Sequence, residues 1–539
     1  MKRIVACLIW LLIAGPSVRA QGFLWAKDFV SDSQSDFVAG FLCKDASDNL
    51  YTDGSFSGTV DFDPGPGSYT MTGSASKFIQ KLDANGNFIW VKRLDVSVRH
   101  MATDDMGNIF LTGAFSGTID FDPGPGTQTL TSIYGPDCYI LKLDSSGTFQ
   151  WVKQIGDGGA SDGSQIKPDN NGNIFVVGTY EWTTDLDPGP GIYIDTAAGN
   201  RDVFVIKLDA AGDFVWAYVS GTALDDEAYG VDVDVLGNVY VISKEPVVNI
   251  TKLNSNGTPV WSKQMDGGVS FGRVTIGDNA LFVSGIFTGT SDFDPGPGTF
   301  SLTSFGMWDI FLLKLDMSGS MVWVKQIGGA GIERATSAII DGVGNIYLYG
   351  DFQSTCDFDP GPQQHNLTAQ TDGINDMDLF LLKLDASGDL VWVHQIGSKR
   401  DEGVGQCILD SHSNIVAFGS YQDTVDFDPG AGVYQLSTYP YTQNGFLFKW
   451  VNPMNVPLIS SGNIVLTTFP NPTTGKIYVS CNEIIRQLTV TDVLGRIISL
   501  ERPQTRKYSV EIDTSPGVYY VTVYSDADRA TQKIVLTNE

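Results

Sequence analysis

The stretch DGVGNIYLYG, residues 341–350, decides the fold because it recurs with its continuation along most of the chain. It begins with an Asp that ends an apolar strand, passes through a Gly-Asn turn and enters a second strand. An insertion with DFDPG follows at 357–361, then FLLKLD at 380–385, a turn with Gly, and WVH at 392–394. Each module therefore predicts four short strands joined by tight turns.

Three independent markers each recur seven times. The Trp of the last strand is found at Trp25, Trp90, Trp151, Trp216, Trp261, Trp323 and Trp392. The Lys of the third strand is found at Lys81, Lys142, Lys207, Lys252, Lys314, Lys383 and Lys449. The turn Asn is found at Asn49, Asn108, Asn173, Asn238, Asn279, Asn345 and Asn414. Seven copies of one supersecondary unit therefore occupy residues 22–452.

The order of the markers predicts a closed ring. Trp25 precedes any Lys-Leu-Asp element, whereas FLFKW at 446–450 ends the series without a following Trp strand. Pairing these two fragments would remove both unpaired edges. We therefore expect an all-β, seven-bladed β-propeller over 22–452, with the strand near residues 24–30 closing the last blade. The pattern resembles the bacterial β-propeller repeat family.

Six modules carry an insertion with Asp-x-Asp-Pro-Gly, and the fourth lacks it. The insertions occupy residues 61–67, 120–126, 185–191, 292–298, 357–363 and 426–432. In an up-and-down blade they share a face with the links between blades, and we expect much of the acidic charge there. Calcium is one explanation, because alternating oxygen ligands suit a hard cation. The other is a Pro-Gly turn whose Asp side chains bond turn amides; no cofactor is required.

Composition excludes some partners. The 539 residues include 34 basic and 62 acidic ones, for a net charge of −28. This argues against binding to nucleic acid or to anionic membrane surfaces. Lys2, Arg3, an apolar run over 4–14 and a small-x-small site ending at Ala20 predict a signal peptide over residues 1–20. No later apolar run is long enough to predict a transmembrane segment.

The end of the chain has a different character. From residue 463 it carries eight basic and eight acidic residues, and its alternating strands predict a small β-sandwich. FPNP at 469–472, DVLGR at 492–496, PGVYY at 516–520 and KIVL at 533–536 resemble the type A C-terminal sorting domain of the type IX secretion system of Bacteroidetes. The resemblance covers 469–539, after a linker at 453–468. It implies export, recognition by the outer-membrane machinery, and release or surface attachment.

Catalytic constellations are scarce, so we predict no catalytic, cofactor-binding or metal-binding residue. GASDG at 159–163 matches G-x-S-x-G but lies in a link between blades, not in a strand-turn-helix. The four His residues, His100, His365, His394 and His412, neither recur nor show metal spacing. We expect 225–227 (DDE) to be a solvated loop and the five cysteines after Cys7 to be buried free thiols.

The leading hypothesis is an exported or surface-attached, non-catalytic binding or adhesion protein. We expect a monomer whose partners are the type IX machinery and a glycan or extracellular protein. The alternatives are a secreted polysaccharide lyase or hydrolase with its site on the loop-rich face, and a structural surface component. Unrepeated polar residues converging on the axis would favour the enzyme. Equivalent residues in every blade would favour multivalent binding.

Overall fold

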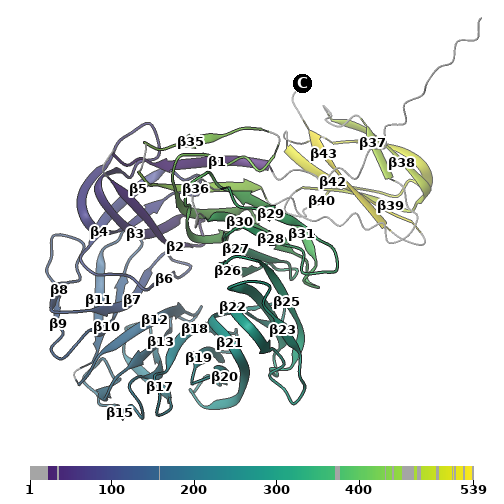
Figure 1. Cartoon of the computed structure of the whole chain (residues 1–539). Coiled ribbons are helices and arrows are strands. Elements are labelled where there is room, and N and C mark those ends of the chain that lie inside the picture. Colours follow the sequence, from purple (N-terminus) through teal and green to yellow (C-terminus); the bar gives the residue numbers. More distant parts are fainter. Residues whose placement is uncertain are drawn as a thin grey trace, which may run out of the picture. The chain divides into compact units, whose positions relative to one another are not determined.

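A computed structural model describes most of the chain (Figure 1). The described residues are 22–32, 35–156, 158–370, 377–430, 432–439, 442–451, 466–469, 475–492, 497–512, 514, 517–525 and 529–536. Every regular element in them is a β-strand, and they contain no helix long and apolar enough to cross a membrane. The chain divides into two compact units, residues 1–452 and 453–539. The predicted signal peptide and most of the predicted linker lie outside the described residues.

The strand pairings of the first unit, within the described residues, fall into seven antiparallel groups of four. The first three groups are β2 (Asp36–Lys44), β3 (Leu50–Asp61), β4 (Thr70–Leu82), β5 (Phe88–Leu94); β6 (His100–Thr103), β7 (Ile109–Phe115), β10 (Asp137–Leu143), β11 (Phe149–Ile155); and β12 (Ser161–Pro168), β13 (Ile174–Tyr180), β16 (Asp202–Leu208), β17 (Phe214–Ser220).

The next two groups share one long strand. They are β18 (Glu227–Val233), β19 (Val239–Lys244), β20 (Val248–Leu253) and the first part of β21 (Pro259–Gly277), then the rest of β21, β22 (Ala280–Asp292), β24 (Asp309–Asp316), β25 (Met321–Gly329). The last two are β26 (Glu333–Ile340), β27 (Ile346–Phe352), β30 (Asp378–Leu384), β31 (Leu390–Ile396), and β32 (Gly403–Leu409), β33 (Ile415–Tyr421), β36 (Asn444–Val451), β1 (Gly22–Phe29).

The first and last strands of this series close the ring. β1 pairs antiparallel with β36, with Trp25 opposite Lys449, which is the pairing that the marker order predicts. Figure 1 shows the seven groups around a centre, with β2, β6, β12, β18 and β26 innermost. This arrangement is a β-propeller, because each sheet packs its faces against its two neighbours and no edge strand is left at the seam.

The recurring Lys and Trp hold neighbouring sheets together. Lys142 on β10 lies opposite Trp151 on β11 and opposite Phe110 on β7. In six sheets the ammonium of the Lys stands 4.8–5.3 Å from the aromatic ring opposite it. The Trp packs against the next sheet, so that a Cβ at Gly147 would lie 3.0 Å from the ring of Trp90. The markers are therefore packing residues.

The insertions form hairpins above the sheets. Three are separate two-stranded pairs: β8 (Thr118–Asp120) with β9 (Thr129–Thr131), β14 (Thr183–Asp185) with β15 (Ile194–Thr196), and β34 (Thr424–Asp426) with β35 (Gln435–Ser437). A fourth, β28 (Thr355–Asp357) with β29 (Asn366–Thr368), also pairs through β28 with the end of β25. In the other two, β3 pairs directly with β4, and β23 (Ser301–Thr303) pairs with the end of β22. The fourth sheet has only a short turn between β19 and β20, as predicted.

The fifth sheet departs from the repeat at its first turn. The other sheets place an Asp-capped turn between their first two strands, whereas Gly277 pairs directly with Ala280 here. The two turn residues, Asp278 and Asn279, have φ values of 49° and 53°. Such a two-residue turn matches the twist of a hairpin, and Asp and Asn tolerate the left-handed region. Asn279 therefore occupies a different turn from the other six marker asparagines.

The second unit is a β-sandwich. One sheet contains β37 (Leu466–Phe469), β38 (Lys476–Ile485) and β41 (Thr505–Glu511). The other contains β39 (Gln487–Asp492), β40 (Ile497–Glu501), β42 (Gly517–Tyr524) and β43 (Arg529–Leu536). Buried residues from both sheets, such as Val479, Val490, Val510 and Val521, form one core between them.

Candidate functional site

The Asp-x-Asp-Pro-Gly insertions are internally hydrogen-bonded turns. In the first one, Asp61 Oδ1 accepts bonds from the backbone N–H groups of Asp63 at 3.0 Å and Tyr69 at 2.8 Å, and Asp63 Oδ1 accepts one from Gly65 at 2.9 Å. The same three bonds recur in the other five insertions. The residue between the two Asp residues packs into the hydrophobic core, since Phe62 and its equivalents are at most 2 % exposed.

This geometry accounts for the motif without a cation. One oxygen of each Asp already caps backbone amides, which is the turn explanation given by the sequence. Calcium binding at the insertions stays a prediction. Among the described residues, one group of three side chains could in principle hold a metal ion: Asp48, Asp410 and His412. None of the three belongs to an insertion. Lys44 at 2.8 Å from Asp48 and Lys449 at 2.7 Å from Asp410 already balance both carboxylates, so this group is a contact across the ring seam.

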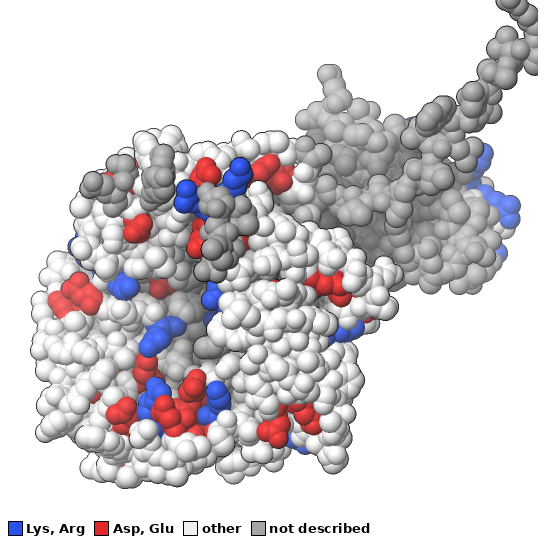
Figure 2. All heavy atoms as spheres, viewed as in Figure 1, with Lys and Arg blue, Asp and Glu red and all other residues white. Residues whose placement is uncertain are grey.

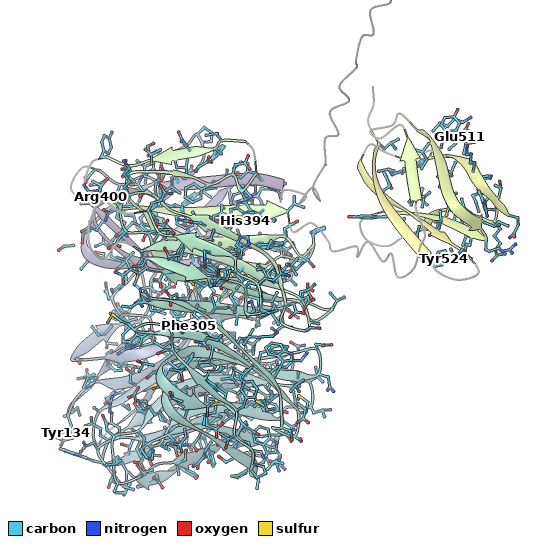
Figure 3. All side chains as sticks on the ribbon, turned by 45° about the vertical axis from the view of Figure 1, so that its right-hand side comes forward. Tyr134, Phe305, His394, Arg400, Glu511 and Tyr524 are labelled. Atoms are coloured by element: carbon cyan, nitrogen blue, oxygen red, sulfur yellow. The ribbon has the colours of Figure 1, made fainter. Side chains whose placement is uncertain are left out.

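The acidic charge is spread over both faces of the first unit. Figure 3 places Tyr134, from an insertion, and Arg400, from a link between sheets, at the same side of the unit, as up-and-down pairing requires. The opposite face carries turns whose Asp caps two backbone amides, as Asp45 does at 2.9 and 3.0 Å. Such Asp residues recur at Asp83, Asp104, Asp144, Asp169, Asp209, Asp234, Asp316, Asp341, Asp385 and Asp410. The insertion face therefore carries much of the acidic charge, as expected, but the opposite face carries a comparable number of Asp residues.

A cavity of about 510 Å³ opens among the inner strands of four consecutive sheets. The residues that define it come from the start of β6 and the residue before it, from β12 and β13, from the segment before β16, from β18 and from β21. They are Arg99, His100, Asp162, Ser164, Gln165, Thr179, Arg201, Glu227, Ala228, Tyr229, Gly272 and Arg273. We call it the axial cavity. In Figure 2, charged side chains of both signs gather around the hollow over β12 and β18.

Hydrogen bonds fix several groups of the axial cavity. Gln165 Oε1 accepts a bond from the backbone N–H of Val231 at 2.7 Å, and its Nε2 lies 3.3 Å from His100 Nε2. Arg99 forms an ion pair with Asp162 at 3.1 Å. Arg201 holds Asp225 through two bonds of 2.7 and 2.6 Å. These contacts join neighbouring sheets, so the lining is preorganised.

Two buried polar atoms of the lining have no hydrogen-bond partner among the described residues. They are His100 Nδ1 and Asp162 Oδ1. Burial, with the nearby charges of Arg273 and Lys167, holds the pKa of His100 well below its usual range, so the imidazole is neutral. Burial raises the pKa of Asp162, against the lowering effect of Arg99. Such atoms are costly unless water or a ligand bonds them.

The lining of the axial cavity is not repeated around the ring. His100 stands four residues before the turn Asp104, and the same position holds Phe41, Gln165, Gly230, Ser337 and Gln406 in other modules. Sequence reasoning set His100 aside because histidine does not recur. The position of His100 in the repeat could have identified it, because a residue at the start of an inner strand faces the axis.

The structure also shows the roles of the other residues that the sequence singled out. Ser161 of the G-x-S-x-G match is buried; its Oγ donates to the carbonyl of Ile155 at 2.6 Å and accepts from Cys138 N, so it is a structural residue. The expectation of a solvated loop at 225–227 was wrong, because Asp226 is fully buried and Glu227 lines the axial cavity.

The remaining candidates have structural positions. His394 packs on β31 between Trp392 and Trp450. The five cysteines among the described residues are free thiols, four of them buried and Cys43 partly exposed. This agrees with the sequence expectation except at Cys43, whose Sγ contacts the carbonyl of Met101.

Two family models match this chain. Residues 467–537 match the secretion system C-terminal sorting domain, and residues 150–179 match a β-propeller repeat. The sorting domain marks proteins that are secreted and often attached to the cell surface, and it implies interaction with the type IX machinery. The export route and the propeller fold expected from the sequence are thereby confirmed.

Relatives and solved structures are distant. An uncharacterised WD repeat-containing protein of Acanthamoeba polyphaga mimivirus is 20% identical over 77% of this chain and 36% of its own length. The regulatory protein FlaEY of Caulobacter vibrioides is 23% identical over 27% of this chain and 15% of its own. The chain thus spans about a third or less of these curated relatives.

Among solved structures, BamB of Moraxella catarrhalis has a TM-score of 0.35 and 13% identity, covering 80% of this chain and 98% of its own. PorZ of Porphyromonas gingivalis has a TM-score of 0.22 and 10% identity, covering 93% of this chain and 81% of its own. With such scores, the fold rests on the strand pairings and the family models.

Proposed function

We propose that this exported propeller is a binding protein that holds one ligand in the axial cavity. The observation that carries the proposal is the pair of polar atoms in the lining, His100 Nδ1 and Asp162 Oδ1, that are buried and have no partner among the described residues. A ligand that bonds these atoms would recover the free energy that their desolvation costs. The cavity volume lies in the range of small-molecule sites.

The arrangement speaks against multivalent binding at the axis. A protein that binds one motif seven times would present equivalent residues in each sheet, whereas His100 is replaced by Phe41 and Gly230 in two other modules. The insertions do repeat, but their Asp side chains are bonded to their own loops. A single site therefore fits the chain better than a multivalent surface.

A polysaccharide lyase or hydrolase is the second candidate, and the same unrepeated lining favours it. The cavity contains a neutral imidazole at His100, a phenol at Tyr229 and carboxylates at Asp162 and Glu227. These are the groups from which general acids and bases are drawn. Incubating the secreted protein with acidic and neutral polysaccharides and measuring new reducing ends or unsaturated products tests this candidate.

The binding proposal is tested by screening the secreted protein on a glycan array beside a cavity-filling variant. Ser164→Tyr places a ring in the axial cavity, and Ser116→Tyr places the same ring at an exposed position after β7, outside the cavity. We expect Ser164→Tyr to abolish binding at an unchanged melting temperature, and Ser116→Tyr to bind as the parent does. Equal binding by all three proteins would refute the axial site.

A further inference from the structure

We infer that the ligand of the axial cavity is a sugar with a single carboxylate, a hexuronic acid or a chain end that carries one. The inference rests on the proposed function and specifies the ligand of the same site. It starts from the ion pairs of the lining, which leave one guanidinium, that of Arg273, without a direct partner among the described residues.

Three of the four cations at or below the cavity are already matched. Arg99 pairs with Asp162 and Arg201 with Asp225. Lys167, deeper among the inner strands, pairs with Asp232 at 2.9 Å. The side chain of Arg273 on β21 lines the cavity, and no ion pair or hydrogen bond joins its guanidinium to a described residue. A guanidinium stays charged in proteins, so Arg273 brings a positive charge without a direct partner to the cavity wall, which Glu227 also lines.

The surroundings of Arg273 make that charge costly. Burial lowers its pKa, which reports the desolvation of the charged group. Burial lowers the pKa of His100, and the charge of Arg273 adds to that effect, so the imidazole is neutral. A partly buried charge without a partner is stabilised when an anion enters its site. The planar fork of a guanidinium binds a carboxylate through two parallel hydrogen bonds.

The rest of the lining suits hydroxyl groups. Ser164, Thr179 and Gln165 offer neutral donors and acceptors, and Asp162 Oδ1 and His100 Nδ1 are buried without partners among the described residues. Asp162 and Glu227 would repel a multiply charged anion such as a phosphate or sulfate ester. One carboxylate beside several hydroxyls is the pattern of an acidic monosaccharide, and the volume of about 510 Å³ admits one or two sugar rings.

Calorimetric titration of the full secreted protein with glucuronate, galacturonate, glucose, galactose and inorganic phosphate tests the inference. We expect an acidic sugar to bind at least about tenfold more tightly than its neutral counterpart, as a charge-assisted bidentate contact implies. Arg273→Gln should remove this preference and Arg273→Lys should keep part of it. Arg93→Gln, at an exposed arginine outside the cavity, is the matched control. Melting curves establish that each variant is folded.

The outcomes separate this inference from the function on which it rests. If neutral sugars bind as well as acidic ones, and if Ser164→Tyr abolishes that binding, the acidic ligand is refuted but the axial binding site is supported. Tighter binding of phosphate than of either uronate would also overturn it. An unchanged preference in Arg273→Gln would show that Arg273 is not the carboxylate contact. If no sugar binds and glycan-array binding ignores Ser164→Tyr, both proposals fail.

Discussion

Ser31 and Asn444 stand 413 residues apart in the chain and are joined by a hydrogen bond of 3.0 Å from Ser31 N to Asn444 Oδ1. Asn444 also donates to Asp28 Oδ1 at 3.0 Å. Both bonds tie the end of β1 to the start of β36, so one side chain serves the closure of the ring. Burial raises the pKa of Asp28 to about 6, which marks this junction as desolvated.

Asn444→Ala should therefore destabilise the propeller. The change leaves Ser31 N and Asp28 without their partner, at a cost of about 1–3 kcal/mol. Thermal unfolding followed by circular dichroism measures the loss. Asn366→Ala, at an exposed position on β29, is the control and should unfold as the parent does. Equal melting temperatures for the two variants would contradict the role of Asn444 in closure.

Gly147→Ala tests the packing of the recurring Trp. Gly147 has a φ of 71° and its Cβ would meet Trp90 at 3.0 Å, whereas Gly117 has a φ of 74° and open space around it. Both substitutions cost about 1–2 kcal/mol from the left-handed backbone alone. Only Gly147→Ala also displaces the indole. Urea unfolding should show a larger loss for Gly147→Ala, and equal losses would show that the contact between sheets is unimportant.

Alkaline pH should destabilise the protein through Glu333. Burial, helped by the charge of Asp309, raises the pKa of Glu333 to about 8 from an ordinary value of 4.5. The folded state then holds a proton that the unfolded state releases. This contribution to stability is full below pH 4.5 and is lost as the pH rises through about 8.

Melting temperatures measured from pH 5 to pH 9 test this window. Glu333→Gln cannot release a proton, so its melting temperature should fall less over that range than that of the parent. Asp105→Asn, at an exposed residue, should follow the parent. A parallel decline for Glu333→Gln would contradict the assignment.

Calcium should leave the melting temperature unchanged. The insertion carboxylates already accept backbone bonds in all six copies, so the loops need no cation to hold their shape. Scanning calorimetry in millimolar calcium and in EDTA makes the comparison. If calcium raises the melting temperature, and if Asp61→Asn and Asp63→Asn reduce that rise, the insertions are calcium-binding loops instead.

Removal of residues 469–539 should stop export at the periplasm. The sorting domain matches residues 467–537 and implies recognition by the type IX machinery. Immunoblots of periplasm, cell surface and medium locate the truncated protein. Circular dichroism of the periplasmic form verifies that the propeller remains folded. Unchanged surface export would refute the assignment.

The propeller, its closure and the sorting domain can all be predicted from the order of residues alone. Trp, Lys and turn Asn recur at fixed spacings because each module makes the same local strand pairings and the same contact with its neighbour. For the Asp-x-Asp-Pro-Gly insertions, the residues allowed two explanations, a calcium loop and a hydrogen-bonded turn. Only the side-chain positions showed the bonds from Asp61 and Asp63 to their own loop.

The axial cavity, in contrast, can be found only in the folded chain. His100, Gln165 and Arg273 belong to three different sheets. His100 and Gln165 hold the same position of the repeat, but the residue type at that position changes from module to module. They meet because ring closure turns the start of every inner strand toward one axis, where the repeat imposes no residue type. The periodicity that identifies the fold therefore gives the positions that face the axis, but not the residue types that gather there or the cavity that they form.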